Sequence, residues 1–286
     1  MTAVVMDGNR VADQIKEELG HRVERLIESG ITPGLGTILV GDDAASARYV
    51  SMKHADCAAI GMASASRTLP QDATQEAVLA AVEEFNNDPA VDAFITQVPF
   101  PPHIDAGTVL MAIRADKDAD GLHPVNLGRL VQGEKGPRPC TPVGIQRLLE
   151  AYEVPIAGAH VVVVGRGLTI GRPLANLLTL KEAYANAAVT VVHTGVNDIS
   201  AYTKTADIII AAAGSPGMIT PEMVKPGAAV VAAGVSFNEE NKVVSDIADG
   251  VEEVAGWLSP KVGGVGPMTR AMLLWNTVTA AESGLA

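Results

Sequence analysis

Short apolar runs and longer amphipathic segments alternate along almost the whole chain. The runs are mostly rich in Val, Ile and Ala and predict strands at 37–40, 93–97, 160–164, 189–193, 207–212 and 228–232. A weaker strand is predicted at 65–69. The segments between them place apolar residues three or four positions apart and predict helices at 46–60, 74–87, 105–113, 141–152, from 171 onward, and at 268–283. Strands that alternate with helices in this way predict an α/β fold with parallel sheets.

Proline and glycine gather between residues 114 and 142, which indicates a boundary between two domains. The helix 268–283 follows the last predicted strand, so we expect the chain to return there to the first domain. The predicted architecture is an N-terminal α/β domain of residues 1–121 with 270–286, and a C-terminal Rossmann-like domain of residues 122–269. A cleft between two such domains is a common place for a ligand.

Composition narrows the classes of partner. Hydrophobic residues make up 48% of the 286 positions and aromatic residues only 3%, which suits a core of Ala, Val, Ile and Leu. The net charge of −12 argues against nucleic-acid binding, because phosphate backbones repel an acidic surface. The two cysteines give no disulfide framework, and no apolar run reaches membrane-spanning length. We expect a soluble, cytoplasmic protein with no membrane partner.

The run Val161–Val164 leads directly into a glycine-rich turn, Gly165-Arg166-Gly167, with Gly171 four residues further on. Glycines at these positions let the backbone turn tightly, approach a pyrophosphate and pack the following helix closely. Such a pattern can also be a purely structural turn. Because this one follows an all-valine strand inside a β-α-β alternation, it predicts a dinucleotide site.

The end of the next strand bears on the choice of cofactor. NAD-binding folds usually carry an acidic residue there for the ribose 2′-hydroxyl. Here the strand runs into His193 and Thr194, and the first acid is Asp198. Arg166 and Thr194 could both donate hydrogen bonds to a 2′-phosphate, so we predict NADP rather than NAD. The alternative is that Arg166 is only an exposed turn residue.

A second group of candidates lies in the N-terminal half. Tyr49 and Lys53 are four residues apart on a predicted helix and therefore share one face, and Gln97 ends a predicted strand. A ring beside an amine suits a flat substrate and a proton carrier, because a lysine with a lowered pKa can act as an acid or base. Most lysines on such helices are merely solvated, so this pattern alone is weak.

The stretch 116–121 holds three carboxylates in five positions. A calcium loop would need a different spacing and a later glutamate, so we expect no metal site. The stretch could be a solvated loop, or Asp120 could bind a heterocycle with adjacent N–H donors.

Further along the chain, Thr141 is a candidate N-cap and Pro142 suits the first turn of a helix. Cys140 shows no partner base and is not expected to be a nucleophile.

Six motifs occur in one order along the chain: Tyr49…Lys53, Gln97-Val98-Pro99-Phe100-Pro101, Lys117-Asp118-Ala119-Asp120-Gly121, Pro139-Cys140-Thr141-Pro142, Gly165-Arg166-Gly167…Gly171-Arg172-Pro173 and Gly263-Gly264-Val265-Gly266-Pro267-Met268-Thr269. Together they closely resemble the bifunctional methylenetetrahydrofolate dehydrogenase/methenyltetrahydrofolate cyclohydrolase family. The resemblance covers nearly the whole chain. It implies that residues 1–121 with 270–286 form a folate-binding catalytic domain and residues 122–269 an NADP-binding domain.

The resemblance also implies an activity and roles for particular residues. The enzyme would oxidise 5,10-methylenetetrahydrofolate with NADP and then hydrolyse the methenyl product to 10-formyltetrahydrofolate. Lys53 would be the central acid/base group, Gln97 would position it, Tyr49 would stack on the aminobenzoyl part of folate and Asp120 would bind the pterin. Further site residues implied are Gly165, Arg166, Gly167, Thr194 and Val235 for NADP, and Gly263, Gly264 and Pro267 for folate. The family is usually homodimeric.

Two rival interpretations remain at this level. One is another two-domain NADP-dependent dehydrogenase, similar to shikimate dehydrogenase, which also uses a cleft and a catalytic lysine. The other is a non-catalytic dinucleotide-binding sensor, since Ala232 stands where the family commonly has an aspartate. Lys261 and Val262 also depart from the usual family residues. The retention of Lys53, Gln97 and Asp120 favours the enzyme with both activities.

Overall fold

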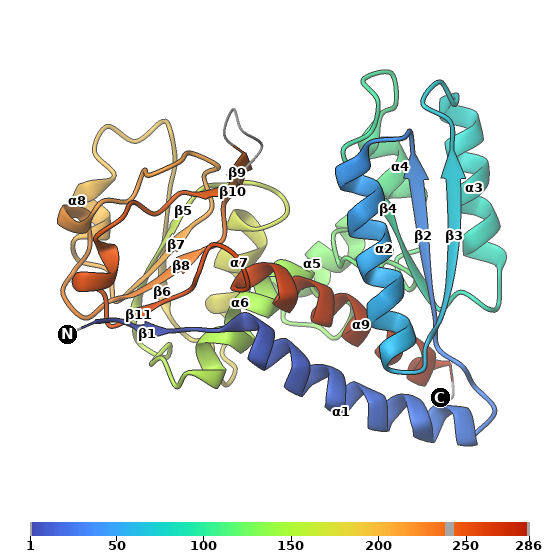
Figure 1. The fold of residues 1–286 in the computed structure, drawn as a ribbon, viewed down its shortest axis with the longest axis horizontal. Helices are drawn as coiled ribbons and strands as arrows, with labels where there is room; N and C mark the ends of the chain where they lie inside the picture. Colours follow the sequence, from blue (N-terminus) through green and yellow to red (C-terminus); the bar gives the residue numbers. More distant parts are fainter. Residues whose placement is uncertain (1, 238–242, 285–286) are drawn as a thin grey trace. The chain divides into compact units, whose positions relative to one another are not determined.

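The computed structural model describes residues 2–237 and 243–284 (Figure 1). The chain divides into two compact units. The unit that we call N-terminal comprises Asp13–Cys140 and Arg270–Ala286, and the unit that we call C-terminal comprises Met1–Ala12 and Thr141–Thr269. The chain passes between them three times, within helices α1 and α9 and at the start of α6, whereas the sequence suggested two passages.

The N-terminal unit contains a three-stranded parallel sheet in the order β3-β2-β4 (Figure 1). Its elements are β2 (Gly34–Val40), α2 (Ala44–Ala59), β3 (Ala63–Leu69), α3 (Gln75–Asn87), β4 (Ala93–Gln97), α4 (Ala106–Ala112) and α5 (Pro124–Gln132). Two long helices, α1 (Gly8–Glu28) and α9 (Val265–Ser283), contribute most of their length to this unit.

The two faces of this sheet are separated by the alternation of side chains along each strand. Ile38 of β2 and Phe94 of β4 point to one face and pack with Phe85 of α3, whose ring meets that of Phe94 edge-on at 5.6 Å. Thr37 points to the opposite face, where its hydroxyl lies 3.0 Å from His54 Nε2 of α2. Helix α2 therefore covers this second face of the sheet. The odd-numbered residues of β4, including Gln97, point to the same face, because they pair with the odd-numbered residues of β2.

The C-terminal unit is built on a six-stranded, wholly parallel sheet in the order β1-β11-β8-β7-β5-β6. Its elements are β1 (Val4–Val5), α6 (Cys140–Ala151), β5 (His160–Val164), α7 (Gly171–Leu178), β6 (Ala188–Val192), α8 (Ser200–Thr203), β7 (Ile208–Ala211), β8 (Ala229–Ala232), the antiparallel hairpin β9 (Val235–Phe237) and β10 (Val243–Ser245), β11 (Trp257–Leu258), and 3₁₀ turns at Pro221–Met223 and Val251–Glu253.

Strand β5 lies between β7 and the edge strand β6, and Val161 to Val164 are completely buried. Such continuous burial explains why its sequence shows no alternation of polar and apolar residues. After β5 the chain adds β6 on one side, and then β7 on the other. The strand order therefore reverses next to β5, and ligands of parallel α/β sheets bind at the carboxyl ends of strands beside such a reversal.

The predicted strands lie within three residues of their observed ends, mostly because they are short apolar runs. The exception is 65–69, where most residues are polar and strand β3 is largely exposed. The predicted unit ranges differ from the compact units at two places. Val4–Val5 joins the C-terminal sheet by pairing with β11, and α5 stays with the N-terminal unit, where the Asn126 side chain donates to Asp118 at 2.9 Å. No helix in residues 2–237 and 243–284 is long and apolar enough to span a membrane.

Two predictions about helices were wrong or incomplete. Helix α6 begins at Cys140, so Thr141 lies inside its first turn and is not the N-cap; its hydroxyl instead lies 3.0 Å from that of Thr269. Helix α1 was not predicted, although Leu19, Val23 and Leu26 mark a buried stripe at helical spacing.

We expect Leu19→Ala to lower the free energy of unfolding by about 2–5 kcal/mol, because the side chain is completely buried and its removal leaves a cavity. The neighbouring Glu18→Ala is the control, since Glu18 is exposed. Urea denaturation of both variants measures the difference. Equal stability of the two variants would show that α1 is not packed as described.

Candidate active site

The Lys53 amine and the Gln97 amide meet on the α2 side of the N-terminal sheet. Gln97 is the last residue of β4, and the strand alternation points it toward α2. Lys53 Nζ donates to Gln97 Oε1 at 2.9 Å. Gln97 Nε2 donates in turn to the Val98 carbonyl at 2.8 Å, which fixes the amide with its oxygen toward the lysine. The predicted pairing of these two residues is therefore present in the structure.

Burial lowers the pKa of Lys53, because a charged ammonium loses hydration in this position. The Asp120 carboxylate opposes that shift, whereas the Arg270 guanidinium adds to it. The Cys140 thiol cannot oppose the shift at neutral pH, because burial raises the pKa of Cys140 and keeps it protonated. The neutral amide of Gln97 accepts a hydrogen bond without bringing a negative charge. The site therefore favours a lysine that can be neutral and act as a base.

Asp120 is brought to the same site. Its side chain is partly buried, and burial raises the pKa of the carboxyl group, with Lys53 acting in the opposite direction and Asp118 in the same direction as burial. The main chain at this position is held by the Cys140 N–H, which donates to the Asp120 carbonyl at 3.1 Å. A carboxyl group held beside a lysine is suited to bind a ligand that presents N–H donors.

The neighbouring Asp118 organises the loop itself. It is 1% exposed; its Oδ1 accepts from the Gly121 N–H at 3.1 Å, and its Oδ2 accepts from the His123 N–H at 2.8 Å and from Asn126 Nδ2 at 2.9 Å. The interpretation of 116–121 as a solvated loop is therefore wrong at Asp118. Within the described part of the chain, no group of three or more His, Cys, Asp or Glu residues is arranged to hold a metal ion.

Tyr49 lies one helical turn before Lys53 on α2, as the spacing predicted. Its side chain is 45% exposed, so its ring is accessible to a ligand.

Cys140 is 2% exposed and its Sγ donates to the Ala119 carbonyl at 3.2 Å. A buried, protonated thiol is a poor nucleophile, which agrees with the sequence analysis.

The glycines of the turn after β5 have different structural roles. Gly165 has φ of 126°, and a Cβ there would collide with the Ala212 carbonyl of the loop that follows β7. A Cβ on Gly171 would collide with the Gly165 carbonyl. A Cβ on Gly167 would meet nothing within 4 Å. Gly165 and Gly171 are therefore required by the packing of the chain itself, whereas Gly167 leaves its backbone open to a ligand.

A basic hollow of about 410 Å³ lies beside this turn, lined by Arg166, Arg172, Ala175, Asn176, Val191 and His193. Arg166 Nη1 lies 3.2 Å from His193 Nε2. His193 Nδ1 accepts from the Gly195 N–H at 3.0 Å, so a neutral ring carries its proton on Nε2. The Arg166 guanidinium and the His193 Nε2–H group are then both donors, and neither can accept from the other. An anion bound beside them would accept a hydrogen bond from each. Thr194 is exposed at the same strand end.

The remaining predicted residues lie elsewhere in the C-terminal unit. Val235 begins β9, and its side chain is outside the described part of the structure. Gly263 and Gly264 form the turn before α9, where the Asn9 N–H donates to the Gly263 carbonyl at 3.1 Å, and Pro267 lies in the first turn of that helix. Gly263 has φ of 81°, so the turn itself already favours glycine there.

Asp246 is a site residue that the sequence analysis missed. It is completely buried, and its Oδ2 accepts from the Ala213 and Gly214 N–H groups at 2.8 and 2.9 Å. It thereby holds the loop after β7 whose Ala212 carbonyl lies against Gly165. Its Oδ1 is buried and has no hydrogen-bond partner among the described residues. No local pattern marks this aspartate, because it lies more than thirty positions from the loop it holds.

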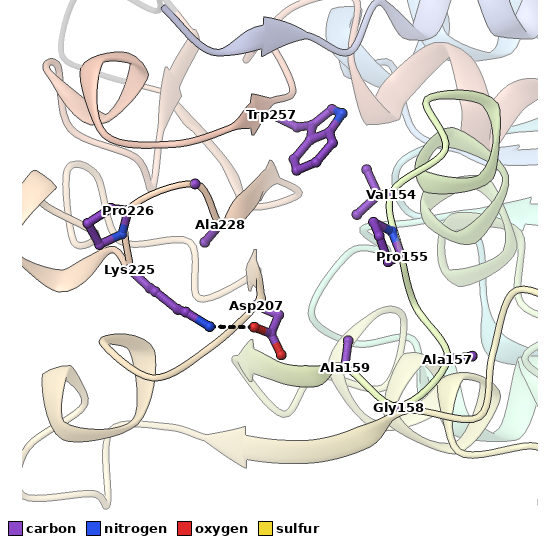
Figure 2. Close-up of a pocket in the computed structure, with 11 residues that line it drawn as sticks. Val154, Pro155, Ala157, Gly158, Ala159, Asp207, Lys225, Pro226, Ala228 and Trp257 are labelled. Atoms are coloured by element: carbon purple, nitrogen blue, oxygen red, sulfur yellow. Dashed lines mark hydrogen bonds and ion pairs between the residues drawn. The ribbon is translucent and has the colours of Figure 1, made fainter. Parts of the chain in front are cut away.

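A second hollow of about 410 Å³ lies at the amino ends of β5, β7, β8 and β11, away from the glycine turn (Figure 2). Trp257 forms one wall, and the loops around Pro155 and Pro226 form others. Its two charged side chains neutralise each other, because Lys225 Nζ lies 2.6 Å from Asp207 Oδ1. This hollow therefore offers little to a charged ligand, and parallel α/β sheets bind ligands at the opposite edge.

The fold and these contacts define a two-unit α/β protein with a nucleotide-type sheet in one unit and a partly buried lysine–glutamine pair in the other. Comparison with known proteins identifies the family. Residues 6–120 match the model of the tetrahydrofolate dehydrogenase/cyclohydrolase catalytic domain, and residues 139–285 match that of the NAD(P)-binding domain of the same family. The chain belongs to this family, which confirms the predicted family, its class of enzyme and its class of cofactor.

Individual relatives agree over their full lengths. The bifunctional protein FolD of Syntrophotalea carbinolica is 54% identical over 282 residues, which are 99% of this chain and 97% of that protein. The crystal structure of the bifunctional enzyme FolD from Campylobacter jejuni has a TM-score of 0.94 at 39% identity, with 99% of each chain covered. The FolD structure from Trypanosoma brucei, complexed with NADP and an inhibitor, has a TM-score of 0.92 at 38% identity and covers 100% of this chain and 99% of that chain.

The first rival interpretation is much more distant. Shikimate 5-dehydrogenase from Thermus thermophilus has a TM-score of 0.51 at 15% identity, covering 87% of this chain and 99% of that chain. A likeness at that identity reflects the fold alone.

The two glycines of the turn give a paired prediction. We expect Gly165→Ala to lower the melting temperature of the free protein, because its Cβ would collide with backbone. Gly167→Ala should leave that temperature nearly unchanged and weaken NADP binding, because its methyl group would occupy space next to the pyrophosphate. Thermal unfolding and calorimetric titration with NADP measure the two effects. Unchanged NADP affinity in Gly167→Ala would place the cofactor elsewhere.

Proposed function

We propose that this chain oxidises 5,10-methylenetetrahydrofolate to the 5,10-methenyl compound with NADP⁺, and then hydrolyses that product to 10-formyltetrahydrofolate. The family membership supports both activities. The observation that carries the assignment of the catalytic group is the 2.9 Å contact between Lys53 Nζ and Gln97 Oε1 in a position that lowers the pKa of the lysine.

A neutral Lys53 suits both reactions. Bound NADP⁺ would supply the hydride acceptor, and loss of hydride leaves a cation delocalised over the two nitrogens and the bridging carbon of the folate. A protonated lysine beside that carbon would be repelled by it, so a site that disfavours the ammonium form assists the oxidation. The positive charge that develops on the folate disfavours the ammonium form of Lys53 further.

Hydrolysis then needs a base. Water attacks the methenyl carbon, and its proton passes to the Lys53 amine as the new C–O bond forms. The proton returns to N5 as the bond from N5 to that carbon breaks, and the remaining hydroxyl proton is released, which leaves the formyl group on N10. Gln97 keeps the amine in one position through both transfers, because its own amide is fixed by the Val98 carbonyl.

Tyr49 and Asp120 are proposed to hold the folate. The exposed Tyr49 ring on the Lys53 side of α2 is suited to stack on the aminobenzoyl group. The Asp120 carboxyl group can accept N–H bonds from the aminopyrimidine edge of the pterin. Gly263, Gly264 and Pro267 are proposed as further folate contacts on the basis of the family motif alone.

The preference for NADP rests on the basic hollow of Arg166 and His193. The two opposed N–H donors, the exposed Thr194 hydroxyl and the absence of an acid at the end of β6 all suit a 2′-phosphate. Gly165, Gly167 and Val235 are proposed to line the rest of the nucleotide site. We also propose that the protein is a cytoplasmic homodimer, on the basis of its family.

We expect Lys53→Met to reduce cyclohydrolase activity by about 10²-fold or more, because positioned proton transfer supplies an effect of that order. In the unmodified enzyme, hydrolysis should rise with pH as Lys53 loses its proton, and burial should move that rise below the pH range of an ordinary lysine. The exposed Lys225→Met is the control. The absorbance of methenyltetrahydrofolate follows the reaction, and a retained rate in Lys53→Met would exclude this base.

We expect Arg166→Ala to reduce kcat/KM for NADP by about ten-fold or more, since one charge-assisted contact is worth about 1.5–3 kcal/mol. The same variant should barely change kcat/KM for NAD, which lacks the phosphate. Steady-state rates with methylenetetrahydrofolate and each cofactor provide the comparison. Equal losses with both cofactors would make Arg166 a structural turn residue, as the alternative interpretation holds.

A further inference from the structure

Asp56 occupies a position from which it could bind Lys53. It lies three residues after Lys53 on α2, and side chains at that spacing are neighbours on a helix. Its carboxylate is instead engaged by two other cations. Arg270 Nε donates to Asp56 Oδ2 at 2.6 Å, and Lys16 Nζ lies 3.6 Å from Asp56 Oδ1. Only 13% of the Asp56 side chain and 24% of the Arg270 side chain are exposed, so this contact is largely shielded from water.

Arg270 comes to this place from a distant part of the chain. It lies on α9, in the part of that helix that belongs to the N-terminal unit, and follows directly after the motif that ends at Thr269. Its pairing with Asp56 joins positions 214 residues apart. The family resemblance assigned neither residue a role.

The charges around Lys53 make this arrangement consequential. On its own helix it has His54 as a neighbour, whose pKa is lowered by burial first and by the Lys53 charge second. From the segment between α4 and α5 it faces the Asp120 carboxylate, from the first residue of α6 the protonated Cys140, and from β4 the neutral Gln97. The positive charge of Arg270 on α9 lowers the pKa of Lys53 further. Arg270 is therefore the cation that counters Asp120.

We propose that Arg270, held by Asp56, is a positioning residue that keeps the Lys53 amine from being protonated. It does so in two ways. Its guanidinium disfavours a second positive charge nearby, and it occupies the carboxylate that would otherwise form an ion pair with the Lys53 ammonium. Arginine suits this role because its own charge does not titrate in proteins. The consequence for catalysis rests on the proposed function of Lys53 as the base.

The charge on Lys53 can be measured without substrate. Trace labelling of the free enzyme with acetic anhydride at a series of pH values, followed by peptide mass spectrometry, gives the fraction of neutral amine at Lys53. We expect the labelling curve of Arg270→Met to move to higher pH than that of the unmodified enzyme. Arg270→Lys should restore the curve, because it returns a positive charge at the same place.

Two further variants separate the contributions. Asp56→Asn keeps the guanidinium and removes the competing carboxylate, so its labelling curve should not move to higher pH. The double variant Asp56→Asn/Arg270→Met should move less than Arg270→Met alone, because no carboxylate remains to pair with Lys53. Circular dichroism and thermal unfolding check that each variant is folded. If Arg270→Met does not fold, the curves of Asp56→Asn and Arg270→Lys still test the proposal.

The same variants are then assayed for hydrolysis of methenyltetrahydrofolate across pH. We expect Arg270→Met to lose about three-fold or more of kcat at neutral pH and to recover it as the pH rises, because a base acts only in its neutral form. Superimposed labelling curves for Arg270→Met and the unmodified enzyme would overturn the inference, as would a rise to higher pH in Asp56→Asn. A shifted labelling curve without any shift in the hydrolysis profile would leave the inference standing and would contradict the role of Lys53 as base.

Discussion

The placement of one amine in a poorly solvated position, with a neutral amide as its hydrogen-bond partner, governs the chemistry of the N-terminal unit. Burial alone makes the charged form of Lys53 costly, and Gln97 satisfies its hydrogen bonding without the negative charge that a carboxylate would bring. The pairing depends on the alternation of β4, which points Gln97 toward α2, and on the helical phase of α2, which turns Lys53 toward the sheet. A shift of one residue in either element would separate the two groups.

The carboxylates near this amine are distributed so that each has a different partner. The Asp118 carboxylate accepts hydrogen bonds from backbone and side-chain N–H groups of its own loop and of α5. The Asp56 carboxylate is paired with Arg270 and Lys16. Asp120 is left as the acid beside Lys53, with burial disfavouring its own charge. Asp118 therefore builds the loop and Asp120 is left to meet a ligand, although the two aspartates lie only two positions apart.

In the C-terminal unit the corresponding constraint is close approach of backbone to backbone. Gly165 must lie against the Ala212 carbonyl and Gly171 against the Gly165 carbonyl, so the turn and the loop after β7 are packed as one body. Asp246 holds that loop by accepting two of its backbone N–H groups. The rigid turn then presents Arg166 toward His193, where two donors face one hollow. A preorganised site of this kind binds an anion without having to rearrange first.

Much of this protein is determined by local sequence. Apolar runs specify the strands because a strand covered on both faces needs apolar residues throughout, helical spacing places Tyr49 and Lys53 on one face, and the glycine spacing marks the turn after β5. Tertiary structure decided what joins distant positions: β1 in the C-terminal sheet, α5 with the N-terminal unit, Asp246 beneath a loop more than thirty residues away, and Asp56 with Arg270 across 214 residues. A single sequence carries no signal for such pairs, because hydrophobic period and turn propensity act over a few residues, whereas an ion pair is set by which helices pack together.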